Sequence, residues 1–117
     1  MSMAEQQTDD FENRWAALEG MLQERFGKTP NLEAVLFLIG INEYRGRLPQ
    51  HKFSKEQKQD LMHVAVCTLL SPLGYYALEA YDSEGWPQFR QLKGGQPEGL
   101  AKQETLLKQQ VLSYFNY

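Results

Sequence analysis

The sequence is short of cysteine, histidine and long apolar runs, and each shortage excludes a class of protein. Cys67 is the single cysteine, so no intrachain disulfide can form, and we expect a reducing location, the cytoplasm. The first ten residues lack the basic start and apolar centre of a secretory signal. The longest apolar run, residues 34–41, is far shorter than the roughly 20 residues that cross a bilayer, so we expect no membrane partner.

The sequence also lacks the spacings that mark common catalytic and cofactor sites. The two histidines and one cysteine form neither a CxxC nor an HExxH pair, and Gly94-Gly95 matches neither glycine-rich phosphate-binding pattern. We therefore assign no catalytic residue and no cofactor, and we expect that the protein is not an enzyme. The formal net charge of −3 gives no overall attraction to nucleic acid, which we do not expect as a partner.

The length and the apolar content that remain fit one globular domain. A chain of 117 residues with 42% hydrophobic residues can bury a core without disulfides or metals. We predict that residues 1–8 are disordered. We predict that residues 9–117 form a single, mainly α domain, a compact arrangement of four helices with one β-hairpin packed on it at about 75–92.

Apolar spacing and capping residues predict the first two helices. The first begins at Asp9 or Asp10 and ends before Gly27, which suits the left-handed position after a helix. Its apolar residues recur every three or four positions and form one stripe: Phe11, Trp15, Leu18, Leu22 and Phe26. The second helix spans residues 30–44, with Thr29 as its cap. Apolar residues cover most of its circumference, so we expect a central, buried helix.

The last two helices follow from similar signals. Ser54 and Gln57 have the spacing of a capping box, which predicts a helix over residues 54–70. The second half of this helix is apolar nearly all round, so we expect it to pack on the second helix. Gly40 inside the second helix costs about 1 kcal/mol relative to alanine, and a close approach of the two helices would offset that cost. The fourth helix spans residues 97–115.

Residues 75–92 are the one segment with a strand pattern. Residues 82–85, Asp-Ser-Glu-Gly, fit a four-residue turn closed by a glycine. Pro87 has no N–H to donate, so we expect it on an edge strand or at a non-hydrogen-bonded position. The alternative is that residues 75–82 form a short helix. A two-stranded hairpin is marginal in water by itself, so something must cover it.

The hairpin also holds five of the fourteen aromatic residues: Tyr75, Tyr76, Tyr81, Trp86 and Phe89. Tyrosine and tryptophan are enriched at the centres of protein interfaces, and a hairpin edge can pair with its own copy across a two-fold axis. We therefore predict a protein interface, with a second copy of the chain or another protein as the partner. The alternative is that these rings pack on the helices as core.

A second set of candidate residues lies on one face of the third helix. Asp60, His63 and Cys67 are spaced i, i+3 and i+7, which places them within about 60° of one another. A carboxylate, an imidazole and a thiolate can all bind a transition metal, so these residues are a candidate metal or small-ligand site. His63 and Cys67 are also candidates for a base and a nucleophile, although nothing mid-helix lowers a thiol pKa. The structural alternative is a buried helix face.

A third set of candidate residues lies in a basic loop. Residues 45–58 carry five lysines and arginines against one glutamate. Arg45, Arg47, His51 and Lys52 precede the N-terminus of the third helix, where free N–H groups favour an anion. An anion, or a single-stranded nucleic acid, is the ligand that such a site would take. The alternative is a solvated basic face.

The balance of these observations favours a non-enzymatic interaction module. We expect a homodimer that uses the hairpin and an adjoining helix. Small-ligand or metal binding on the third helix, and anion binding by the basic loop, are the alternative functions.

Overall fold

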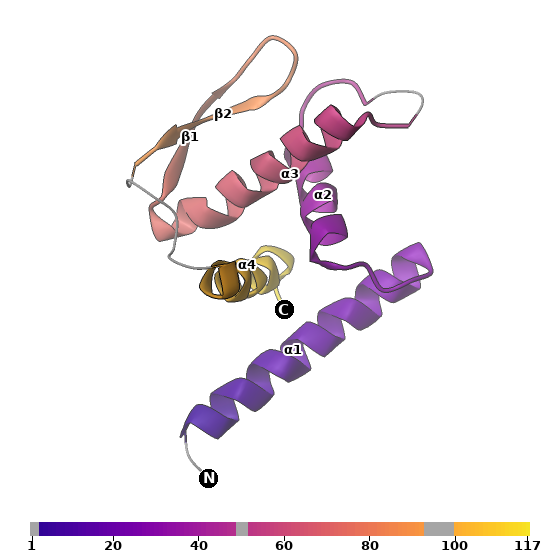
Figure 1. The fold of residues 1–117 in the computed structure, drawn as a ribbon, viewed down its shortest axis with the longest axis vertical. Coiled ribbons are helices and arrows are strands. Elements are labelled where there is room, and N and C mark those ends of the chain that lie inside the picture. The colour runs from indigo at the N-terminus through magenta and orange to yellow at the C-terminus, as the bar shows by residue number, and fades with distance from the viewer. Residues whose placement is uncertain (1–2, 49–51, 93–99) are drawn as a thin grey trace.

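The computed structural model describes residues 3–48, 52–92 and 100–117, which form four α-helices, a short 3₁₀ turn and a two-stranded hairpin (Figure 1). The predicted mainly α class with one hairpin is therefore confirmed. In chain order the elements are α1 (Met3–Phe26), α2 (Leu32–Glu43), α3 (Lys55–Leu70), η1 (Ser71–Leu73), β1 (Tyr76–Tyr81), β2 (Pro87–Gln91) and α4 (Leu100–Phe115).

Helix α1 begins earlier than predicted. Its first residue is Met3, whereas we expected a start at Asp9 or Asp10. The residues before Asp9 include Met, Ala, Glu and Gln, which have high helix propensity and therefore extend the helix. The other end is as predicted: Gly27 has a φ of +79°, and its N–H donates to the Gln23 carbonyl at 2.8 Å.

The apolar stripe of α1 is fully buried only in its middle. Leu18 and Leu22 are buried, whereas Phe26 at the end of the stripe is 49% exposed. Trp15 lies at the edge of the core, with the Lys108 ammonium of α4 5.5 Å from its ring centroid. Helix α4 therefore covers the middle of α1 (Figure 1), and the stripe extends beyond the part that is covered.

Side-chain caps fix the starts of α2 and α3. Asn31, rather than the predicted Thr29, caps α2, and its Oδ1 accepts the Ala34 N–H at 2.8 Å; asparagine is at least as good a cap as threonine. Ser54 begins α3 with the predicted capping box. Its Oγ accepts the Gln57 N–H at 3.1 Å, and the Gln57 Oε1 accepts the Ser54 N–H at 2.8 Å.

Helices α2 and α3 approach each other closely at Gly40. A Cβ at this position would overlap the carbonyl oxygen of Leu61 and lie 2.6 Å from its carbonyl carbon. Ile39 and Leu61 beside this contact are buried. A side chain larger than hydrogen does not fit between the two backbones, which confirms the close approach expected from the sequence.

One core joins the four helices. Its buried residues are Leu18, Leu22, Val35, Leu36, Ile39, Ala65, Leu69, Leu70, Leu107, Val111 and Leu112. Within the described residues, no polar or charged residue is classed as buried. Helix α4 lies between α1 and the α2–α3 pair, and the hairpin lies on the side of α3 away from α1 (Figure 1).

The hairpin forms where predicted, so the helical alternative for residues 75–82 is wrong. Strands β1 and β2 are antiparallel, with Tyr81 opposite Pro87. The Asp82 N–H donates to the Trp86 carbonyl at 2.9 Å. Hydrogen-bonded and non-hydrogen-bonded pairs alternate along an antiparallel ladder, so the next pair, Tyr81–Pro87, is non-hydrogen-bonded. Pro87 therefore occupies the kind of position that its missing N–H requires.

A bulge in β1 decides which side chains share a face. Leu78 is opposite Phe89, and beyond this pair β1 has one extra residue, Glu79. An extra residue reverses the side-chain alternation beyond it. Leu78 and Tyr81 therefore lie on the same face of the hairpin as Phe89, although they are three positions apart.

Replacing Gly40 with alanine should lower the free energy of unfolding by about 1–3 kcal/mol, because the Leu61 backbone would have to move. The matched control is Gly20→Ala in α1, where an added Cβ meets nothing within 4 Å. That change should raise the free energy of unfolding by about 0.5–1 kcal/mol through helix propensity. Urea denaturation measures both values. A stabilising Gly40→Ala change would contradict the close approach of α2 and α3.

Candidate functional site

The first attachment of the hairpin lies at the end of α3. The Tyr75 N–H donates to the Leu70 carbonyl at 3.2 Å, directly before β1 begins. Tyr75 and Tyr76 pack against the edge of the helical core. The open end of the hairpin is therefore fixed beside the last turn of α3.

The second attachment lies at the hairpin tip, where residues 81–86 contact residues 44–46 after α2. We call this the tip contact. The Arg45 N–H donates to the Gly85 carbonyl at 3.0 Å, and the Arg45 guanidinium lies 4.0 Å from the centroid of the Tyr81 ring. The Trp86 ring packs on Tyr44 with centroids 4.6 Å apart.

Two glycines allow the backbones to meet at the tip contact. A Cβ on Gly46 would overlap the Glu84 carbonyl oxygen, and a Cβ on Gly85 would overlap the Gly46 backbone and lie 2.6 Å from the Arg45 carbonyl carbon. Gly85 also has a φ of +93°, which other residues rarely adopt. The predicted turn therefore closes on a glycine for two reasons, its own conformation and its contact with Gly46.

Asp82 gives the turn its shape. Its Oδ1 accepts the N–H groups of Glu84 and Trp86, each at 2.9 Å. Its Oδ2 accepts the Gln88 side-chain amide at 3.3 Å. This arrangement is an aspartate-stabilised turn that leaves the carboxylate at the inner side of the hairpin.

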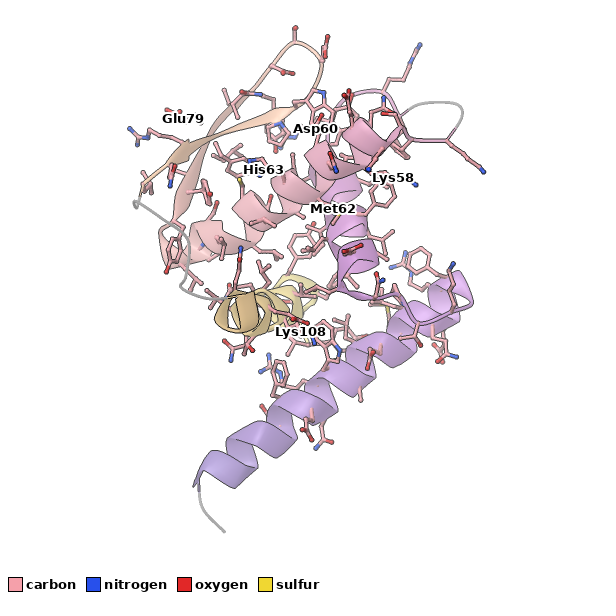
Figure 2. The ribbon with its side chains drawn as sticks, in the orientation of Figure 1. Lys58, Asp60, Met62, His63, Glu79 and Lys108 are labelled. Carbon is pink, nitrogen blue, oxygen red and sulfur yellow. The ribbon has the colours of Figure 1, made fainter. Side chains whose placement is uncertain are left out.

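Between these two attachments, α3 and the hairpin enclose a partly open cavity of about 550 Å³. The wall from α3 consists of Asp60, His63, Val64 and Cys67. The wall from the hairpin includes Tyr76, Asp82, Trp86, Pro87 and Phe89. Figure 2 shows Asp60 and His63 on the part of α3 next to the hairpin. The structure thus brings the predicted α3 face and three of the five predicted hairpin aromatics into one site.

The hairpin aromatics face their own chain more than we expected. Tyr81 lies under Arg45, Trp86 lies on Tyr44, and Tyr76 and Phe89 line the cavity. All five predicted interface rings are partly buried. The rings therefore serve partly as the core that the sequence left as an alternative, and the interface assignment stays a prediction.

His63 and Cys67 lie in contact on the α3 wall, with 3.6 Å between the His63 Nε2 and the Cys67 Sγ. Cys67 is 2% exposed, and burial raises the pKa of its thiol to about 11. The thiol is therefore protonated near neutral pH. A protonated thiol is a poor nucleophile and a poor metal ligand, so the geometry does not support nucleophilic chemistry here.

The metal prediction gains no support from the described part of the chain. There, no three histidine, cysteine or carboxylate side chains come close enough to hold a metal ion. Asp60 shares the cavity wall with His63 and Cys67, as the helix spacing predicted, but it is exposed. The three residues share a face without forming a coordination site.

The structure describes three of the four residues predicted to bind an anion in the basic loop. Arg45, Arg47 and Lys52 are all exposed, Arg45 also contacts Tyr81 at the tip contact, and His51 lies outside the described residues. Ser54 satisfies an N–H at the start of α3 through the predicted capping box, so that donor is not free for an anion. Arg45 and Arg47 line one hollow at the tip together with the carboxylates of Asp82 and Glu84, and the anion site stays a prediction.

The cavity is acidic. Asp60 and Asp82 line it, and no lysine or arginine belongs to its described lining. At 100° per residue, Lys58 projects about 160° away from Asp60 around α3 (Figure 2). Sequence reasoning missed Asp82 as part of the cavity and Tyr44 as part of the tip contact that supports it. Only the turn pattern pointed to Asp82, and nothing local to the sequence points to Tyr44.

Comparison with family models, with curated proteins and with solved structures found no match to this chain. Across the described ranges, none of the helices combines the length and apolar character needed to cross a bilayer.

Alkylation of Cys67 by iodoacetamide at pH 8 should be at least about 100-fold slower in the native protein than in the urea-unfolded chain. The reason is the rise in thiol pKa from 9.0 to about 11, which lowers the thiolate fraction by about that factor, while burial adds steric protection. Mass spectrometry of timed samples gives both rates. Native and unfolded rates within tenfold of each other would show an accessible, ionised thiol.

Proposed function

We propose that this chain is a non-enzymatic interaction module that forms a homodimer by pairing its β1 with β1 of a second copy. The observation that carries the proposal is that the outer edge of β1, the edge away from β2, has no paired strand within the described residues. The Leu92 N–H donates to the Tyr75 carbonyl at 2.9 Å, so this pair is hydrogen-bonded. The alternation of the ladder then turns the N–H and C=O groups of Tyr76 and Leu78 away from β2.

These outward groups are available within the part of the chain that the structure describes. There, neither Tyr76 nor Leu78 has a backbone hydrogen bond to another element, and no third strand joins the sheet. The Leu78 side chain is 48% exposed. An unpaired edge next to an exposed apolar side chain is a surface that favours strand pairing.

A second copy related by a two-fold axis at Ala77 would supply hydrogen-bond partners for this edge. It places Tyr76 of one copy opposite Leu78 of the other, and each such pair exchanges two backbone hydrogen bonds. The Tyr76 ring of one copy would then cover the exposed Leu78 of the other. Two marginal hairpins become one four-stranded sheet, which is the usual size of a stable sheet.

The proposal includes a cytoplasmic location and no catalysis. The single cysteine supports a reducing compartment, and its protonated thiol supports a role in packing rather than in chemistry. The absence of catalytic spacings in the sequence agrees with this role.

The dimer predicts a specific cross-link. Ala77→Cys should form an intermolecular disulfide under mild oxidation, because Ala77 and its symmetry mate face each other at a non-hydrogen-bonded position about 4.5 Å apart at Cα. Light scattering should give about twice the chain mass of 13.5 kDa, and Leu78→Glu should halve that mass by placing a charge in the interface.

The matched control is Ala80→Cys on the same strand. In the proposed register the two copies of this residue lie about 20 Å apart, so they should not cross-link. A monomer at high concentration together with no Ala77→Cys cross-link would contradict the proposal. Equal cross-linking at both positions would contradict the register.

A further inference from the structure

We propose that the cavity between α3 and the hairpin binds the guanidinium group of an arginine side chain presented by another protein. This inference goes beyond the homodimer, because the cavity lies on the face of the hairpin rather than at the edge of β1. It rests on the walls of the cavity, on its charge, and on a guanidinium that the hairpin already holds elsewhere.

The aromatic wall suits a flat, cationic group. Tyr76, Trp86 and Phe89 line the cavity from the hairpin side. Aromatic faces carry negative potential and attract cations, and guanidinium groups also stack on them through their planar surface. The volume of about 550 Å³ lies within the range of small-ligand sites, about 300–1,000 Å³. The space is therefore sufficient for a long side chain and for part of the chain that carries it.

The charge of the cavity selects a cation over an anion or a neutral group. Asp60 has neither an ion pair nor a hydrogen bond among the described residues. Asp82 adds a second negative charge, and its three hydrogen-bond donors are neutral. A guanidinium can donate to a carboxylate through two parallel N–H groups while its face lies on a ring. An apolar ligand would instead remove the Asp60 carboxylate from water without a partner.

The hairpin tip shows the aromatic half of this recognition inside the chain. There, the Arg45 guanidinium lies 4.0 Å from the Tyr81 ring centroid. Farther along the hairpin, the cavity offers further rings and adds the carboxylates of Asp60 and Asp82. Its described lining contains no lysine or arginine, so an arginine from a partner fits both the rings and the charge.

The test uses two acetylated and amidated peptides, Ser-Gly-Arg-Gly-Ser and the same peptide with citrulline in place of arginine. Citrulline keeps the shape of arginine and removes its charge. The readout is the indole N–H signal of Trp86 in nuclear magnetic resonance titrations of the full chain, with the Trp15 signal on α1 as an internal reference. The arginine peptide should shift the Trp86 signal saturably and bind at least about tenfold more tightly than the citrulline peptide.

Two variants locate the binding. Asp60→Asn should weaken the arginine peptide about tenfold, whereas Glu104→Gln, an exposed carboxylate of α4 outside the cavity, should not change it. Phe89→Leu should also weaken it, because the variant keeps an apolar side chain and removes a ring. The folded spectrum of each variant is recorded first. If Phe89→Leu does not give a folded spectrum, Asp60→Asn alone decides the test. Asp60 is exposed, so its replacement should leave the fold intact.

Equal binding of the two peptides, no shift of Trp86 with either, or full affinity in Asp60→Asn would overturn the inference. The same titration on Leu78→Glu separates this site from the homodimer. The arginine peptide should bind that variant at least as tightly, whether or not the wild-type chain is a dimer, because the added carboxylate lies on the face of the hairpin that position 78 shares with Phe89. Loss of binding in Leu78→Glu would show that the site needs the dimer, and would overturn the inference in its present form.

Discussion

The contact between the backbones of Gly46 and Gly85 decides where the hairpin lies, and the candidate site depends on it. The hairpin leaves α3 at its last turn, and its tip returns to the chain where these two backbones meet, with Arg45 on Tyr81 and Trp86 on Tyr44 beside them. Because both ends are fixed, the middle of the hairpin spans α3 at a distance and encloses the cavity. A side chain at either glycine would separate the two backbones. The cavity is therefore a consequence of two attachments rather than of loose packing.

The energetics of the hairpin are finely balanced. The hydrogen bond from Arg45 to Gly85 contributes about 1 kcal/mol, and the contacts of Arg45 with Tyr81 and of Trp86 with Tyr44 contribute about 0.5–1.5 kcal/mol each. These gains fix an element that is marginal by itself. The helical core is held by many buried residues from four helices, whereas the strands of the hairpin have one buried residue, Pro87, and otherwise partly buried or exposed ones. The hairpin should therefore open locally before the core unfolds, and a partner that binds it would stabilise it.

Features with a local physical cause could be predicted from the sequence. The capping box of Ser54, the left-handed Gly27 and the non-hydrogen-bonded Pro87 each depend on a few neighbouring residues. The start of α1 was misplaced because good helix formers before Asp9 outweigh a good cap. Phe26 belongs to the predicted apolar stripe and is nevertheless exposed, because a stripe shows which face is apolar but not how much of it a neighbour covers. The α3 face and the hairpin aromatics were both identified, but their meeting in one cavity depends on Tyr44 and Gly46. No local pattern relates those residues to a turn about forty positions away.

Hydrogen exchange in Gly46→Ala shows whether the tip contact holds the hairpin in place. We expect the amides of β1 and β2 to lose protection and those of α2 and α3 to keep it, because the tip contact holds the hairpin and not the helical core. Unchanged protection in both strands would show that the hairpin keeps its place without the close approach of Gly46 and Gly85. Loss of protection throughout the chain would show that the core depends on the tip, and either result would refute the role given to this contact.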